Sequence, residues 1–174
     1  MSEVYDRWPQ IARKNFSVNF SKVDIKNIDH VVFAGMGGSG TIGDVFASIL
    51  SKTDIHVSVI KGYLLPKTVD DSTLVVTTSI SGNTLETISI LKNVEKMNAK
   101  FVALSSGGIM EKFCMDKKIK YYKIEEEHSP RASFVGFLYS ALNILEQIVP
   151  VKKTDVSESI ESYLIYKNLF VQKI

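Results

Sequence analysis

Three hydroxyl side chains stand at close spacing in the stretch SISGNT, which runs from Ser79 to Thr84. Ser79, Ser81 and Thr84 follow an apolar segment and open a helical pattern, and Gly82 allows a tight backbone path between them. Hydroxyl groups and free backbone N–H groups at the start of a helix suit a compact dianion such as a phosphate monoester. Simple helix capping by Ser81, Asn83 or Thr84 is the alternative, but a cap requires only one of these residues. The repeated hydroxyls therefore favour a phosphate site.

A second candidate for anion binding is the glycine-rich stretch GMGGSGTIGD, residues 35–44. Gly35, Gly37 and Gly40 match the pattern G-x-G-x-x-G of dinucleotide-binding turns. That fingerprint also needs an acidic residue about 20 positions further on, at the end of the second strand, to hold the ribose. The second predicted strand instead runs out through the residues IKGY (60–63), which include no carboxylate. We therefore expect this loop to bind a different phosphate, without a nicotinamide, flavin or other cofactor.

Short apolar runs alternate with helical patterns along most of the chain. The helical patterns cover 41–50, about 84–97, a short segment after the turn SSGG (105–108), and about 132–149. The runs that predict strands are His30–Ala34, His56–Ile60, Thr73–Thr78, Lys100–Leu104 and Lys120–Ile124. Continuous apolar strands separated by helices predict an α/β fold, with a five-stranded parallel sheet covered by helices on both faces in a three-layer αβα sandwich.

The two ends of the chain lie outside this repeat. We expect an additional helix over Glu3–Asn15 and an amphipathic C-terminal helix over 154–174, beyond a domain that spans residues 1–153. The broad apolar face of the C-terminal helix needs a surface to pack on, which could be the domain itself, a second subunit or a second domain. The residues of that face are Ile160, Tyr163, Leu164, Tyr166, Leu169 and Phe170.

Composition restricts the classes of partner. The chain has 174 residues, 21 of them basic and 19 acidic, so the formal net charge is only +2 and favours neither nucleic acid nor an anionic membrane as a partner. The N-terminus has no apolar signal segment and no apolar run reaches about 18 residues, so we expect a cytoplasmic protein. Three histidines and one cysteine do not form a standard zinc spacing, so no metal site is expected. Cys114 is expected to be a small buried hydrophobe.

Four motifs in order resemble the sugar isomerase (SIS) domain, and within it the archaeal bifunctional phosphoglucose/phosphomannose isomerases. They are GMGGSGTIGD (35–44), SISGNTLET (79–87), SSGG (105–108) and PRAS (130–133), and the likeness runs from about residue 5 to about residue 150. The resemblance implies a doubly wound, flavodoxin-like sheet. It also implies that Gly37, Gly38 and Ser39 line the active site and that Ser79, Ser81 and Thr84 bind a sugar phosphate. Arg131 is implied as an active-site residue.

The chemistry that the resemblance implies is aldose–ketose isomerisation through a cis-enediol, with glucose 6-phosphate, fructose 6-phosphate and mannose 6-phosphate as ligands. Such a reaction needs a base to move a proton and a positive charge beside the developing oxyanion. Arg131 fits the second role, because a guanidinium is always charged and rich in donors. A solvated loop arginine that balances Glu125, Glu126 and Glu127 is the alternative.

The identity of the base stays open at this point. In two-domain members of the family, a glutamate base and a ring-opening histidine come from the second half of the chain, and this sequence stops at Ile174. Glu86 as base and His128 as acid are the local candidates, although Glu86 also suits a helix N-terminus and a loop histidine is usually just exposed. His30 and His56 fit strand boundaries better than a site.

Three interpretations of the function follow. The chain could be a phosphosugar isomerase domain that is incomplete without a second SIS domain. It could also be a single-domain enzyme similar to 6-phospho-3-hexuloisomerase that completes its site as a homodimer. A non-catalytic sugar-phosphate sensor is the third interpretation.

Overall fold

The computed structural model of the protein describes residues 6–93 and 96–171, with side chains as far as Ile165. Within these residues, five strands form one sheet in the order β2-β1-β3-β4-β5, and every neighbouring pair is parallel. The strands are β1 (His30–Ala34), β2 (His56–Ile60), β3 (Thr73–Ser79), β4 (Lys100–Ser105) and β5 (Lys120–Lys123). The predicted strands are therefore confirmed, with β3 and β4 each one residue longer and β5 one residue shorter than expected.

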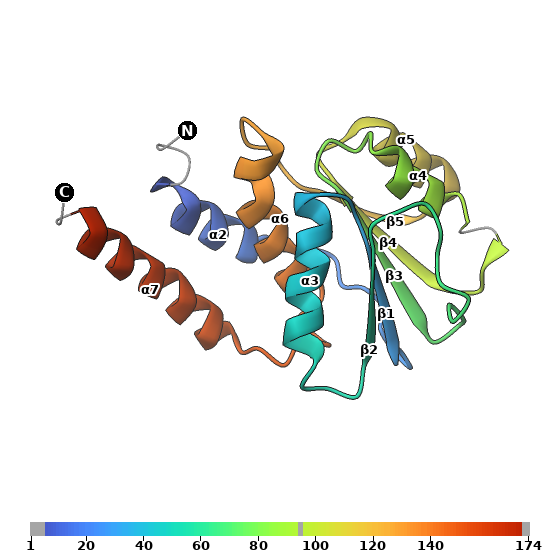
Figure 1. The fold of residues 1–174 in the computed structure, drawn as a ribbon, viewed down its shortest axis with the longest axis horizontal. Helices are drawn as coiled ribbons and strands as arrows, with labels where there is room; N and C mark the ends of the chain where they lie inside the picture. The colour runs from blue at the N-terminus through green and yellow to red at the C-terminus, as the bar shows by residue number, and fades with distance from the viewer. Residues whose placement is uncertain (1–5, 94–95, 172–174) are drawn as a thin grey trace.

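Helices cover both faces of the sheet. Figure 1 shows α3 and α6 on one face and α4 and α5 on the other, which confirms the doubly wound three-layer fold. The described helices are α2 (Trp8–Phe16), α3 (Gly38–Leu50), α4 (Leu85–Leu91), α5 (Gly108–Lys117), α6 (Pro130–Ile144) and α7 (Lys153–Val171). No helix among the described residues is both long and apolar enough to cross a membrane.

Alternate residues of the buried strands build two separate cores, because successive strand side chains point to opposite faces. Val31 and Phe33 of β1 face α3, where Phe33 stacks on Phe46 with ring centroids 4.8 Å apart. Val32 faces the other core, which includes Cys114 of α5. Burial raises the pKa of the Cys114 thiol to about 11, so this cysteine is the inert buried residue that the sequence predicts.

The helical crossovers leave a crevice beyond the carboxyl ends of β1 and β3. The chain leaves β1 through α3 to reach β2 on one side, and it leaves β3 through α4 to reach β4 on the other side. The connections after β1 and β3 therefore diverge, and ligands of open parallel sheets bind at such a switch point, beyond the carboxyl ends of the strands.

Several helices begin or end elsewhere than the sequence predicts, among them α2, which spans Trp8–Phe16 instead of Glu3–Asn15. α3 begins at Gly38 instead of Thr41, so the glycine loop supplies its first turn. α4 ends at Leu91, short of the predicted Met97, and the Asn93 side chain donates a hydrogen bond back to the Ser89 carbonyl just beyond the helix end. α6 ends at Ile144, and residues 145–148 continue as turns that keep the same apolar side inward, which explains the predicted extension to Val149.

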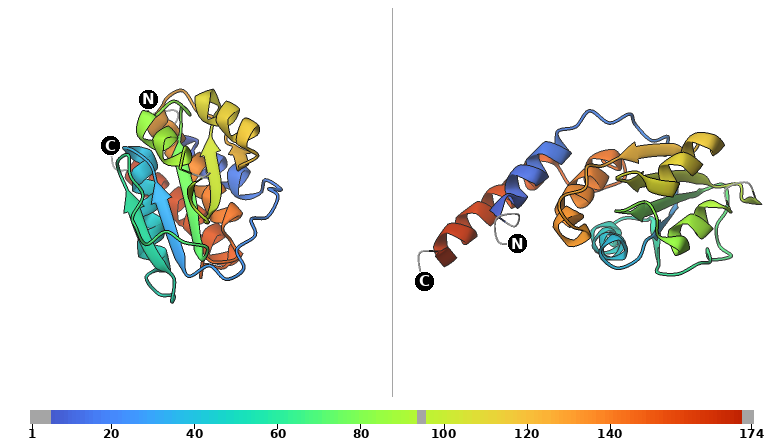
Figure 2. Two further views of the ribbon diagram at one scale, coloured as in Figure 1. Left: turned by 90° about the vertical axis from the view of Figure 1, so that its right-hand side faces the viewer. Right: turned by 90° about the horizontal axis from the view of Figure 1, so that it is seen from above.

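The first half of the tail helix packs against α2. α2 packs on α6, and α7 lies beside α2 (Figure 2). Val156 and Ile160 of α7 are buried against Ile11 of α2 and Val135 of α6. Of the predicted helices, residues 3–5, 94–95 and 172–174 lie outside the described residues, as do the side chains of Tyr166, Leu169 and Phe170.

Candidate functional site

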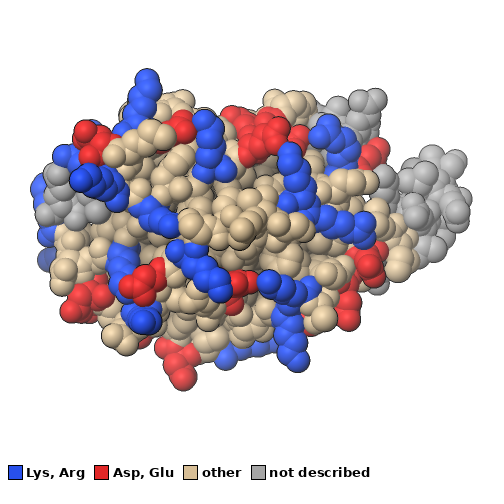
Figure 3. Space-filling view, turned by 180° about the vertical axis from the view of Figure 1, so that it is seen from behind, with Lys and Arg blue, Asp and Glu red and all other residues tan. Residues whose placement is uncertain are grey.

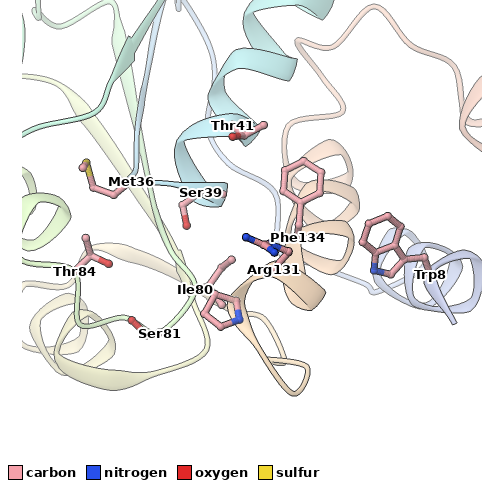
Figure 4. Close-up of a pocket in the computed structure, with 11 residues that line it drawn as sticks. Trp8, Met36, Ser39, Thr41, Ile80, Ser81, Thr84, Arg131 and Phe134 are labelled. Carbon is pink, nitrogen blue, oxygen red and sulfur yellow. The ribbon is translucent and has the colours of Figure 1, made fainter. Parts of the chain in front are cut away.

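A pocket of about 500 Å³ opens at the carboxyl edge of the sheet, where the connections after β1 and β3 diverge. Its size falls in the range of small-molecule sites, about 300–1,000 Å³. Figure 4 shows the side chains that line it. They are Trp8, Met36, Gly38, Ser39, Thr41, Ile80, Ser81, Thr84, Pro130, Arg131 and Phe134.

Two hydroxyls of the SISGNT stretch line this pocket. Thr84 is the N-cap residue of α4, but its hydroxyl accepts no hydrogen bond from the first turn of the helix. The hydroxyl of Ser81 accepts a hydrogen bond from the backbone N–H of Asn83, at 3.3 Å. Plain capping therefore does not account for either hydroxyl, and the first-turn N–H groups of α4 have no side-chain cap.

Ser79 lies behind the pocket lining and is not part of it. The residue is only 1% exposed and does not line the pocket. Its hydroxyl oxygen lies 2.8 Å from that of Thr84 and accepts a hydrogen bond from the Gly82 N–H at 3.1 Å. The spacing of the three hydroxyls suggests equal roles, whereas the structure makes Ser79 the residue that orients Thr84.

The turn that carries Ser81 is locked against the turn after β4. Gly82 has a φ of +69°, and a Cβ atom there would lie 1.8 Å from the carbonyl oxygen of Gly107. The Ile80 carbonyl accepts the Ser106 N–H at 2.9 Å, and the Gly82 carbonyl accepts the Met110 N–H at 2.9 Å. Only glycine fits at position 82, and the two turns hold the hydroxyls in place.

The glycine loop forms the opposite edge of the pocket. Gly37, with a φ of +53°, is the N-cap of α3, and the next two residues, Gly38 and Ser39, line the pocket while Gly37 itself does not. The end of β2 is occupied by Lys61, whose ammonium forms an ion pair with Asp44 at 2.7 Å. A positive side chain therefore stands where a dinucleotide site needs a carboxylate.

Arg131 is the charged residue of the lining. It is the second residue of α6, after Pro130 and the N-cap Ser129, whose hydroxyl accepts the Ala132 N–H. In Figure 4 its guanidinium points into the same space as the Ser39 hydroxyl.

The alternative role for Arg131 was to balance the three glutamates before α6. Those carboxylates have other partners: Glu125 pairs with Lys14, Glu127 pairs with Arg7, and Glu126 accepts a hydrogen bond from Ser106. Among the described residues, Arg131 forms no ion pair with any of them. The contacts of the three glutamates therefore do not support a charge-balancing role for Arg131.

Neither local candidate for acid–base chemistry lines the pocket. Glu86 lies in the first turn of α4, where its negative charge raises the pKa of the Tyr63 hydroxyl. His128 is exposed in the loop before α6. His30 and His56 are paired in register at the amino ends of β1 and β2, at the far edge of the sheet. The described pocket lining thus contains no carboxylate and no imidazole.

Sequence reasoning missed the apolar part of the lining, which is formed by Trp8, Met36, Ile80, Pro130 and Phe134. Met36, Ile80 and Pro130 lie inside three of the four motifs, but the sequence indicates roles only for the glycine, hydroxyl and arginine residues of those motifs. Trp8 carries no local signal, because its contact with Ala132 joins residues 124 positions apart. The described residues also hold no group of three His, Cys, Asp or Glu side chains that could bind a metal ion.

Comparisons with known proteins agree with the fold and the motifs. The family model of the SIS domain matches residues 24–148. The chain belongs to the SIS-domain family. It is 37% identical over 133 residues to the bifunctional phosphoglucose/phosphomannose isomerase of Caldicellulosiruptor bescii, a match that covers 76% of this chain and 38% of that protein. The resemblance read from the motifs is thereby confirmed.

Solved structures share the fold of this SIS domain. The C-terminal domain of glucosamine-fructose-6-phosphate aminotransferase from Francisella tularensis superposes with a TM-score of 0.66 at 16% identity, covering 92% of this chain and 51% of that one. A protein of E. coli CFT073 superposes with a TM-score of 0.58 at 18% identity, covering 91% of this chain and 94% of that one. The chain spans half or less of the length of the curated relatives that it matches.

Proposed function

We propose that this SIS domain binds phosphosugars in the described pocket and takes part in their aldose–ketose isomerisation through a cis-enediol. Glucose 6-phosphate, fructose 6-phosphate and mannose 6-phosphate are the proposed ligands. The observation that carries the proposal is the meeting of Ser81, Thr84, Ser39 and Arg131 in one pocket at the switch point of the sheet. The similarity to the bifunctional phosphoglucose/phosphomannose isomerase of Caldicellulosiruptor bescii supports the same class of substrate.

The phosphate group is proposed to lie at the part of the pocket lining that Ser81 and Thr84 form, which we call the hydroxyl wall. Ser81 and Thr84 offer hydroxyl donors there, and the start of α4 adds N–H groups that no side chain caps. The start of α3, at Gly38 and Ser39, adds a second positive helix end. Two helix N-termini and neutral hydroxyls suit a dianion that must also be released.

Arg131 is proposed to stabilise the enediolate oxyanion. A cation in the first turn opposes the helix dipole and costs about 0.3–1 kcal/mol, so helix stability gives no reason for arginine at this position of α6. A fixed guanidinium beside a developing negative charge does give a reason, because such groups lower the barrier without rearranging during the reaction.

The base is proposed to come from outside the described pocket, because no lining residue can abstract a proton at neutral pH. A second SIS domain, or a second copy of this chain in a homodimer, would supply it. Glu86 and His128, the local candidates for base and acid, are not part of this proposal, since neither residue lines the pocket.

Two alternative functions make different experimental predictions. The first alternative is a single-domain enzyme similar to 6-phospho-3-hexuloisomerase that completes its site as a homodimer. A non-catalytic sensor is favoured by the pocket lining, which has binding groups but no base.

Ligand-dependent melting tests the binding proposal. Glucose 6-phosphate should raise the melting temperature, because a ligand that binds only the native state stabilises it, whereas sorbitol, which has no phosphate, should not. No shift with any hexose phosphate would contradict the proposal.

A coupled isomerase assay on the same chain then separates enzyme from sensor. Turnover together with a dimer in light scattering supports a complete homodimeric enzyme. Binding without turnover supports either a sensor or a half-site, and turnover that returns on adding a separately produced second SIS domain identifies the half-site.

A further inference from the structure

The pocket has two unlike walls. Ser81 and Thr84 give one wall its hydroxyl groups, with Met36 and Ile80 close to them, whereas the wall away from these hydroxyls carries the aromatic side chains of Trp8 and Phe134 (Figure 4). In the view of Figure 4, Ser81 and Thr84 lie at one end and Trp8 lies at the other, with Arg131 and Phe134 between them. A free phosphate ion needs only the first wall. A hexose phosphate also presents apolar C–H faces along its carbon chain, and the second wall offers them a matching surface.

Trp8 is held in this wall from two directions. Its indole Nε1–H donates a hydrogen bond to the Ala132 carbonyl at 3.3 Å, in the first turn of α6. Its ring also lies against Tyr163 of α7, with centroids 6.4 Å apart and the rings tilted by 44°. Contacts to two different helices fix the indole before any ligand arrives, and a fixed aromatic surface binds without a large loss of conformational entropy.

The hydrogen bond to Ala132 also ties Trp8 to the charged residue of the site. Ala132 follows Arg131 directly, so the indole and the guanidinium are anchored in the same turn of α6. Because Trp8 and Arg131 both line the pocket, a sugar bound beside the guanidinium can also contact the indole.

We propose that Trp8 is a sugar-contacting, specificity-determining residue, whose indole covers a C–H face of the hexose while the hydroxyl wall holds the phosphate. This inference rests on the proposed function. It predicts that Trp8 separates hexose phosphates from inorganic phosphate, because only a hexose phosphate has a carbon chain beyond the phosphate that can contact the indole.

The single tryptophan of the chain gives a direct test. Fructose 6-phosphate should change the intrinsic emission of Trp8 along a saturable curve, whereas inorganic phosphate should bind in calorimetry without that change. If fructose 6-phosphate binds in calorimetry but leaves the emission unchanged, this inference is wrong while the proposed function stands. If neither ligand binds in calorimetry, the proposed function fails as well.

Variants separate the ring from its hydrogen bond. Trp8→Leu should weaken fructose 6-phosphate binding about tenfold in calorimetry, which corresponds to the loss of one aromatic contact, and should leave inorganic phosphate binding unchanged. Trp8→Phe keeps a ring and loses the N–H, so it should recover most of the affinity for the sugar phosphate.

Phe16→Leu is the matched control, because Phe16 lies on the same helix and packs in the same cluster but does not line the pocket. It should change neither affinity. An equal loss for both ligands in Trp8→Leu, or the same loss in Phe16→Leu, would show that Trp8 acts only through the fold and would overturn the inference.

Discussion

The hydroxyl oxygens of Ser79 and Thr84 lie 2.8 Å apart across the turn between β3 and α4. Ser79 is buried and Thr84 lines the pocket, so one hydroxyl orients the other. In the motif Ser-x-Ser-x-x-Thr, Ser81 and Thr84 therefore line the pocket, and Ser79 lies buried behind Thr84.

This relationship predicts the behaviour of Ser79→Ala. The change removes hydrogen bonds to Thr84 and to the Gly82 N–H and should lower the free energy of unfolding by about 1 kcal/mol in urea titrations. It should also weaken sugar-phosphate binding through Thr84. The double variant Ser79→Ala/Thr84→Ala should therefore bind no more weakly than Thr84→Ala alone. Fully additive losses would mean that Ser79 contacts the phosphate itself.

The contact between Gly82 and Gly107 predicts a severe effect of one methyl group. Gly82→Ala would place a Cβ 1.8 Å from a backbone oxygen at a φ of +69°, so we expect a loss of about 3 kcal/mol or more in unfolding free energy, together with loss of ligand binding. Gly62→Ala is the control, because its Cβ would meet nothing within 4 Å, and it should stay within about 0.5 kcal/mol of wild type. A fully stable Gly82→Ala protein would show that the two turns are not packed as described.

Arg131 should matter for chemistry more than for stability. Arg131→Met removes a cation that opposes the dipole at the start of α6, so the unfolding free energy should stay the same or rise by up to about 1 kcal/mol. In the catalytically complete protein, turnover should fall about 100-fold or more, because the oxyanion loses its charged partner. Arg13→Met, an exposed change on α2 outside the pocket, should leave turnover intact. Equal turnover for Arg131→Met and wild type would remove Arg131 from the mechanism.

His30 predicts how stability depends on pH. Burial, followed by the nearby charge of His56, lowers the pKa of His30 in the folded state below its value of about 6.5 in the unfolded chain. The unfolded state therefore binds the proton more readily, and the stability that neutral His30 contributes above about pH 6.5 is lost as the pH falls toward the folded pKa. Urea titrations at pH 7.5 and pH 5.5 should show this loss, and His30→Gln should reduce it. An unchanged difference in His30→Gln would assign the pH dependence to other groups.

The fold could be predicted from the sequence because its signals are local. The apolar strands, the glycine turn after β1 and the hydroxyl turn after β3 all lie within short windows, and parallel strands bring their carboxyl ends to one edge. The burial of Ser79 could not be predicted, because it depends on how the turn after β3 packs against the turn after β4. The place of Trp8 in the pocket depends on α2 packing against α6, a contact that no short window of sequence encodes. The cytoplasmic location and the homodimer stay predictions.

The central claim is that the hydroxyls of Ser81 and Thr84 hold the phosphate of a sugar phosphate. The most direct measurement is a calorimetric titration of fructose 6-phosphate into the wild-type chain and into Ser81→Ala/Thr84→Ala, with circular dichroism to confirm that both are folded. Saturable binding to the wild type and a loss of about 100-fold or more in affinity for the double variant is the predicted result, since two hydrogen bonds to a charged group contribute about 1.5–3 kcal/mol each. Equal affinity of the two folded proteins would contradict the claim.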